Sequence, residues 1–146
     1  MTKPLTIARS EQAQELLEIV LDDMPAENAP ALLAFLQERG ACSRVDGALA
    51  GAMHETEPCC FIFPRMNLGR ELSKFSAHFY FGNGTWEVCL LFLPALPGMD
   101  FEGEAAYLAP VREVCQEMFA TFRPRRIVCG FESAIEDDMQ IFAIGE

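Results

Sequence analysis

Positive charge is scarce in this sequence: 11 lysines and arginines stand against 22 aspartates and glutamates, and the formal net charge is -11. A surface of this sign repels phosphate backbones and acidic lipid headgroups, so nucleic acids and membrane surfaces are disfavoured as partners. The basic residues are too few and too dispersed for a nucleic-acid footprint, the main groups being Arg65, Arg70 and Lys74, and Arg123, Arg125 and Arg126. A basic protein partner is favoured instead.

Long apolar runs are also lacking. The first residues contain no stretch that resembles the apolar core of a signal peptide. The longest apolar run, around Val88 to Leu93, ends at Pro94, far short of the roughly 20 residues that span a bilayer. We therefore expect a cytoplasmic protein. Most of its 6 cysteines lie in hydrophobic runs and are expected to be reduced: Cys42, Cys59, Cys60, Cys89, Cys115 and Cys129.

The length and composition are those of one globular unit. The chain has 146 residues, of which 51% are hydrophobic and 23% charged, and we find no repeat or linker. This favours a single domain over residues 1–146.

The apolar spacing and capping residues of the N-terminal third predict two helices. Apolar residues recur at helical spacing behind a possible cap at Ser10, which predicts a first helix from about Glu11 to Asp22 that Pro25 ends. A second helix is expected from about Ala29 to Arg39, with Asn28 as its cap, Pro30 in its first turn and Gly40 just past its end. Residues 42–54 fit either a loose helix or a loop.

The middle of the chain predicts a β-hairpin. Apolar and polar residues alternate over 74–81, and Asn83-Gly84 between two such runs is a strong signal for a two-residue turn. That turn sets a register with one apolar face, pairing Phe81 with Trp86, Phe79 with Val88, Ala77 with Leu90 and Phe75 with Phe92. The opposite face then pairs Tyr80 with Glu87 and His78 with Cys89.

Further strands and one long helix complete the predicted fold. Cys59–Phe63 is a short strand closed by Pro64, and a long helix lies between Glu102 and Phe122 with Pro110 in its first turn. Two last strands, Arg125–Phe131 and Met139–Ile144, flank an acidic loop. We expect an α+β fold: an antiparallel or mixed sheet of four to five strands with about three helices packed mainly on one face.

No catalytic, cofactor or metal motif is complete. The segment from His54 to Cys60 resembles the zinc deaminase pattern, but Thr56 replaces the required glutamate and the adjacent Cys59 and Cys60 point to opposite faces of a strand. His78 and Cys89 form a potential Cys–His pair that lacks a third, orienting group. We expect no enzyme, no cofactor and no metal.

The first predicted helix carries an acidic stripe opposite its apolar side. Its members are spaced 4, 3 and 4 residues apart: Glu11, Glu15, Glu18 and Asp22. At about 100° per residue they fall within a sector of roughly 60°. No lysine or arginine lies between Arg9 and Arg39, so no local ion pair relieves the like-charge repulsion of about 0.2–0.5 kcal/mol per pair.

The loop after the penultimate strand carries a second acidic group. Loops that a sheet holds in place commonly bind partners. We therefore predict two groups of partner-binding residues: those of the acidic stripe, and the loop residues Glu132, Glu136, Asp137 and Asp138.

The aromatic hairpin FSAHFYFGNGTWEVCLLFL, in a small acidic chain without a catalytic motif, resembles the bacterial family catalogued as immunity protein fifty-two. Such immunity proteins belong to interbacterial toxin systems, including polymorphic and type VI secretion toxins. The resemblance implies a cytosolic, non-enzymatic protein that binds a cognate toxin domain stoichiometrically and blocks its active site or substrate entry. It assigns no functional residue.

Two alternative functions are left open. One is a secretion or assembly chaperone that holds one client protein without inhibiting it. The other is a small enzyme that works through His54, His78 or carboxylates. A toxin gene directly upstream would favour immunity, and secretion genes without a toxin domain would favour the chaperone.

Overall fold

The computed structural model describes residues 16–46, 59–82, 84–93, 101–131 and 140–145. Its strands are β1 (Leu17–Pro25), β2 (Arg44–Asp46), β3 (Cys59–Asn67), β4 (Glu71–Gly82), β5 (Thr85–Leu93), β6 (Arg126–Phe131) and β7 (Gln140–Gly145). Its helices are the 3-10 turn η1 (Ala26–Asn28) and the α-helices α2 (Ala29–Arg39) and α3 (Phe101–Phe122).

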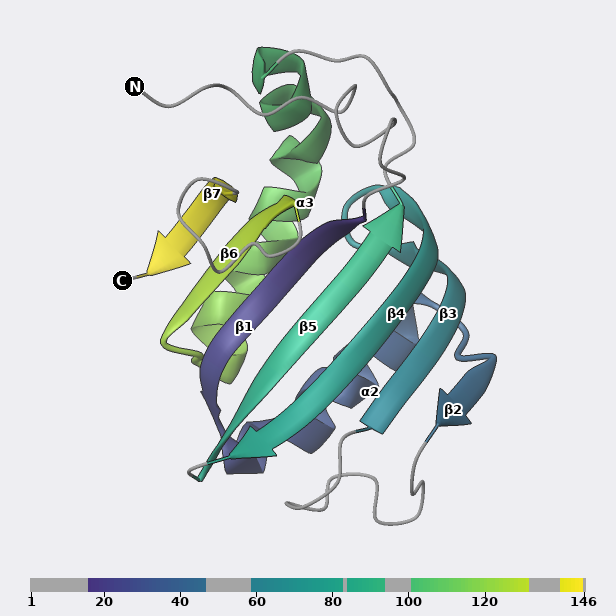
Figure 1. The fold of residues 1–146 in the computed structure, drawn as a ribbon, viewed down its shortest axis with the longest axis vertical. Coiled ribbons are helices and arrows are strands. Elements are labelled where there is room, and N and C mark those ends of the chain that lie inside the picture. The colour runs from purple at the N-terminus through teal and green to yellow at the C-terminus, as the bar shows by residue number, and fades with distance from the viewer. Residues whose placement is uncertain (1–15, 47–58, 83, 94–100, 132–139, 146) are drawn as a thin grey trace.

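The strands form a single seven-stranded sheet in the order β2-β3-β4-β5-β1-β6-β7, and every neighbouring pair is antiparallel. Figure 1 shows α2 and α3 on the same side of this sheet. The prediction of four to five strands with about three helices is therefore wrong, because the described residues form seven strands and two α-helices. The side of the sheet away from α2 and α3 is called the open face.

The largest error concerns the predicted first helix, because residues 17–22 of it belong to strand β1. This strand lies between β5 and β6, and its first five residues, Leu17 to Leu21, are all buried. Ile19 and Leu21 are buried in the main core and Val20 is buried on the opposite face, so the strand lacks strict apolar–polar alternation and its apolar residues also fall at helical spacing. The β-branched pair Ile19-Val20 was the local sign of a strand.

The predicted hairpin register is confirmed over most of its length. Phe81 pairs with Trp86, and Gly82 pairs with Thr85 beside the turn, where Gly84 has a φ of 82°. The further predicted pair of Phe75 with Phe92 is not formed, because the register shifts between Ser73 and Ser76. Lys74, at a φ of 53°, lies within this irregularity.

The predicted helix over residues 29–39 is confirmed as α2, but Asn28 does not cap it. The side-chain amide of Asn28 donates instead to the carbonyl of Phe122, at 2.7 Å. Phe122 is the last residue of α3, where helix carbonyls lack partners within the helix. Asn28 therefore ties the start of one helix to the end of the other.

The long predicted helix is confirmed as α3, but Pro110 lies in its interior rather than in its first turn. The turn between β3 and β4 packs against this point. A Cβ atom added at Gly69, whose φ is +83°, would lie 2.4 Å from the Pro110 carbonyl oxygen. Among the described residues no helix is long and apolar enough to cross a bilayer.

Two other boundaries differ from the predictions. Strand β3 continues through Pro64 to Asn67, and β2 pairs only with Cys60, Phe61 and Ile62, so Pro64 lies beyond the last pair on that edge. A proline is tolerated there because no partner requires its missing N–H. Part of the segment 42–54, left open above, is strand β2, and residues 47–54 lie outside the described part.

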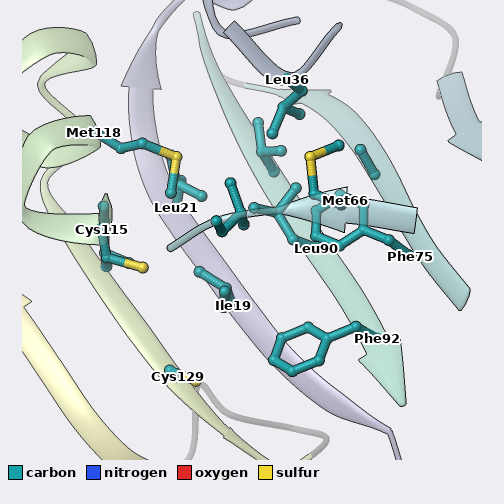
Figure 2. Packing of buried hydrophobic residues seen from close by; sticks show 14 of the residues in the cluster. Ile19, Leu21, Leu36, Met66, Phe75, Leu90, Phe92, Cys115, Met118 and Cys129 are labelled. Atoms are coloured by element: carbon teal, nitrogen blue, oxygen red, sulfur yellow. The ribbon is translucent and has the colours of Figure 1, made fainter. Parts of the chain in front are cut away.

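The main core lies between the sheet and the helices. It is rich in aromatic side chains, and the largest fully buried ones are Trp86, Phe61, Phe63, Phe75, Phe79, Phe92 and Phe131. Figure 2 shows Cys115 and Met118 of α3 pointing towards Ile19 and Leu21 of β1. Four of the six cysteines are buried, namely Cys59, Cys89, Cys115 and Cys129.

Candidate functional site

The structure describes only two of the eight acidic residues predicted to bind a partner. Glu18 and Asp22 lie on β1, whereas Glu11 and Glu15 and the loop residues Glu132, Glu136, Asp137 and Asp138 lie outside the described residues. Glu18 is buried, with 8% of its surface exposed. Four residues along a strand span roughly 13 Å, so Glu18 and Asp22 do not form the compact helical stripe expected above.

A row of side chains crosses the open face at the level of Cys89. Cys60 pairs with His78, His78 with Cys89, Cys89 with Val20, and Val20 with Val128. Val20, Cys89 and Val128 form a small buried cluster separate from the main core. The open face therefore changes along this row from polar, over β3 and β4, to apolar, over β1 and β6.

The predicted pairing of His78 with Cys89 is confirmed, but it does not activate the thiol. Cys89 Sγ donates to Glu87 Oε2 at 3.6 Å. Burial, followed by the negative charges of Glu18 and Glu87, raises the pKa of Cys89 well above its usual range. A nucleophilic cysteine needs a lowered pKa, so this environment has the opposite effect.

The His78 ring has its own polar neighbours on the open face. Its Nε2 atom lies 2.9 Å from Ser76 Oγ and 4.0 Å from Cys60 Sγ. Its ring stacks on that of Tyr80, with 6.5 Å between the centroids and an angle of 8° between the planes. Among the described residues, no three His, Cys, Asp or Glu side chains are grouped so as to hold a metal ion.

The end of β1 carries an ion-pair cluster that joins it to the start of β6. Arg125 contacts both Asp22, at 2.5 Å, and Asp23, at 3.1 Å, and Arg126 contacts Asp22 at 3.3 Å. The backbone N–H of Arg125 also donates to the Asp22 carbonyl at 2.7 Å. The anionic partners, Asp22 first, raise the pKa of Arg125. The negative charge of Asp22 is thus compensated by two arginines that are distant from it in the sequence.

A pocket lies beside this cluster, at the end of the β4–β5 hairpin. Its volume is about 240 Å³, and it is lined by Asp23, Tyr80, Phe81, Gly82, Thr85 and Glu87. Figure 1 shows the hairpin end and the end of β1 at the same end of the sheet. The predicted hairpin register already placed Tyr80 opposite Glu87, but no sequence signal placed Asp23 beside them.

Comparison with known proteins identifies a similar fold. A chain in the 1.75 Å crystal structure of the toxic C-terminal tip of CdiA from Pseudomonas aeruginosa in complex with immune protein matches with a TM-score of 0.69. The match covers 89% of this chain and 94% of the other at 15% identity, so it shows the fold alone. No protein-family model matches the chain, and no curated protein matches it either.

Proposed function

We propose that this protein is an immunity protein that binds the toxin domain of an interbacterial toxin system and neutralises it. The observation that carries the proposal is the fold likeness to a chain from a complex of a toxin tip with immune protein. Of the two roles in such a complex, the immune role suits this chain better, because its acidic composition and its aromatic hairpin resemble those of immunity proteins.

The charge of the chain supports the same role. A net charge of -11 speeds association with a basic partner and gives it complementary contacts. A toxin that acts on nucleic acids or nucleotides needs a basic cleft, and an acidic protein seated over that cleft would block its active site or substrate entry. The protein would act without chemistry of its own, as a single domain in the cytoplasm that the toxin enters.

The acidic residues predicted from the sequence remain proposed contacts, with one change of emphasis. Asp22 is paired with two arginines and Glu18 is buried, so both are less available than the exposed helical stripe assumed. Glu11, Glu15, Glu132, Glu136, Asp137 and Asp138 keep their proposed role. The type VI secretion route also remains a prediction, because the structural likeness is to a CdiA complex.

Co-expression with the toxin domain encoded by a neighbouring gene tests the proposal. We expect the wild-type chain to rescue cell growth and to co-purify with the toxin domain in a stoichiometric complex. The control is the same toxin domain expressed with an unrelated acidic protein of similar size. Failure of both rescue and co-purification would contradict the proposed function.

Neutralising the loop acids tests their role separately. We expect the combined change Glu132→Gln, Glu136→Gln, Asp137→Asn and Asp138→Asn to lower the association rate at low salt, because steering by charge is lost. Stopped-flow association measured over a salt series gives the result. An unchanged rate and salt dependence would remove the loop from the proposed contact surface.

A further inference from the structure

The pocket at the hairpin end has three walls, and each is held by the fold. Glu87 of β5 pairs directly across the strands with Tyr80 of β4. Asp23 supplies the third wall, and its two carboxylate oxygens are occupied by Thr85 Oγ1 at 3.2 Å and Arg125 Nε at 3.1 Å. Phe81, which also lines the pocket, packs edge-on against Trp86, with 5.0 Å between the ring centroids. The pocket is thus preorganised.

An irregularity in β1 brings the carboxylates together. Leu21 pairs with Val88 and Met24 pairs with Trp86, so both Asp22 and Asp23 lie opposite the single residue Glu87. This extra residue is a β-bulge, in which Asp23 adopts a φ of 53°. Bulges of this kind change the direction of a side chain, and here the side chain of Asp23 lines the pocket.

The charges around the bulge do not balance. Three carboxylates meet there, from Asp22, Asp23 and Glu87, and the described residues supply two guanidinium groups, from Arg125 and Arg126. Both guanidinium groups are engaged by the two aspartates. The contact shown for Glu87 is with the weakly donating thiol of Cys89, at 3.6 Å. Within the described part of the chain, one negative charge at the pocket therefore has no cationic partner, and we take it as the contact for a cation from a partner.

Tyr80 provides an aromatic surface for that cation. It is 46% exposed, which makes it the one large hydrophobic side chain that stands open to solvent in the described part of the chain. Its ring is steadied by stacking on His78. Burial, followed by the Coulombic effects of Cys89 and Cys60 and then of Glu87 and Glu18, raises the pKa of Tyr80.

We propose that this pocket receives an arginine side chain of the toxin, with the guanidinium over the Tyr80 ring and paired to Glu87. The inference rests on the proposed function and names the contact within it. Arginine suits the site because its planar group stacks on aromatic rings and pairs with carboxylates in a fork. At about 240 Å³ the pocket is below the usual 300–1,000 Å³ of small-molecule sites, so one side chain fits it better than a metabolite.

Affinity measurements on single variants test the pocket. The probe is the catalytically inactivated toxin domain, purified from the co-expressed complex and titrated by calorimetry. We expect Tyr80→Ala and Glu87→Gln each to weaken binding at least about thirtyfold, the range of interface hot spots, and Tyr80→Phe to keep most of the affinity because it keeps the ring. We also expect the affinity of Glu87→Gln for the toxin domain to depend less on salt concentration than that of the wild-type chain.

Glu113→Gln is the matched control, because it removes the same charge from an exposed position on α3. We expect it to leave binding within about twofold, since isolated surface charges contribute little. Thermal unfolding of each variant establishes that it is folded.

The outcomes separate the two proposals. If the wild-type chain binds and rescues while Tyr80→Ala and Glu87→Gln match Glu113→Gln, the proposed function stands and the pocket assignment is wrong. If the wild-type chain neither rescues nor binds, the proposed function fails, and the arginine site fails with it.

Discussion

The two faces of the sheet are built from alternate residues of the same strands, yet they have different compositions. The helix-covered face of β4 and β5 carries Ala77, Phe79, Trp86, Val88 and Leu90, all buried. The open face of the same strands carries Ser76, His78, Tyr80, Glu87 and Cys89. Since side chains alternate along a strand, one short hairpin supplies both sets.

This contrast separates stability from recognition. The covered face contributes large apolar areas that are removed from water, which is the dominant favourable term in folding. The open face contributes an exposed ring, carboxylates and a pocket, which add little to folding but suit a partner of opposite charge. Changes on the first face should affect unfolding, and changes on the second should affect binding.

Two neighbouring residues test this separation with the largest expected effect. Phe79 is fully buried, and its ring packs edge-on against Phe61 and Trp86 with centroid distances of 5.6 and 6.1 Å. We expect Phe79→Ala to lower the free energy of unfolding by about 3–5 kcal/mol. For Tyr80→Ala on the open face we expect a change within about 0.5 kcal/mol. Urea denaturation of both variants measures the difference, and equal losses would refute the division between faces.

The buried thiols give a smaller, pH-dependent effect on both faces. Burial raises the pKa of Cys115 to about 12 and raises that of Cys129 as well. The pKa of Cys89 is raised by burial and by Glu18 and Glu87. An unfolded cysteine ionises near pH 8.5, so above this pH the unfolded chain binds fewer protons than the native chain. Stability should therefore fall as the pH rises from about 8.5 towards 12.

The expected loss is up to about 1.4 kcal/mol per pH unit for each buried thiol in that window. Urea denaturation at pH 8, 9 and 10 measures it, and Cys115→Ala should reduce the slope with pH. Glu87→Gln should also reduce this slope, but only by lowering the raised pKa of Cys89 on the open face. The two variants therefore report on different faces of the sheet. A stability that stays constant to pH 10 would contradict the raised pKa values.

The smallest expected effect concerns the hydroxyl of Tyr107, a residue of α3 that is buried in the main core. Tyr107 is buried, and its hydroxyl has no hydrogen-bond partner among the described residues. Arg70 lies 4.3 Å from the centre of its ring and donates from Nε to the Tyr107 carbonyl at 2.9 Å, contacts that phenylalanine would keep. We expect Tyr107→Phe to leave the free energy of unfolding unchanged or to raise it by up to about 1 kcal/mol.

Thermal and urea unfolding of Tyr107→Phe provide the check, with Tyr80→Phe on the open face as the matched control. A loss of more than about 1 kcal/mol for Tyr107→Phe alone would mean that the hydroxyl is satisfied in solution.

Sequence reasoning succeeded where a short segment specifies its own geometry. The Asn83-Gly84 turn was enough to pair Tyr80 with Glu87, because a two-residue turn leaves one register that keeps the apolar residues together. It also located α2 and α3, whose lengths exceed those of most strands. It failed at β1, whose apolar run fits a helix or a buried strand equally well.

The candidate site was only half predictable for the same reason. The two walls formed by Tyr80 and Glu87 follow from the hairpin, so their sequence signal was present. The wall formed by Asp23 depends on a bulge in a strand that was taken for a helix. Glu18 and Asp22 were singled out as exposed charges, but their surroundings depend on strands from the rest of the chain.

By itself, the sequence determined a net charge of -11, the absence of any complete catalytic motif, the hairpin and the two confirmed helices. Only the tertiary structure decided how the charge is arranged. Arg125 and Arg126 lie 102–104 residues from Asp22 and Asp23, yet they form ion pairs with these aspartates. Of the three carboxylates at the bulge, Glu87 has no cationic partner among the described residues. Charge is a sum over residues, whereas its compensation depends on distances that only the folded chain sets.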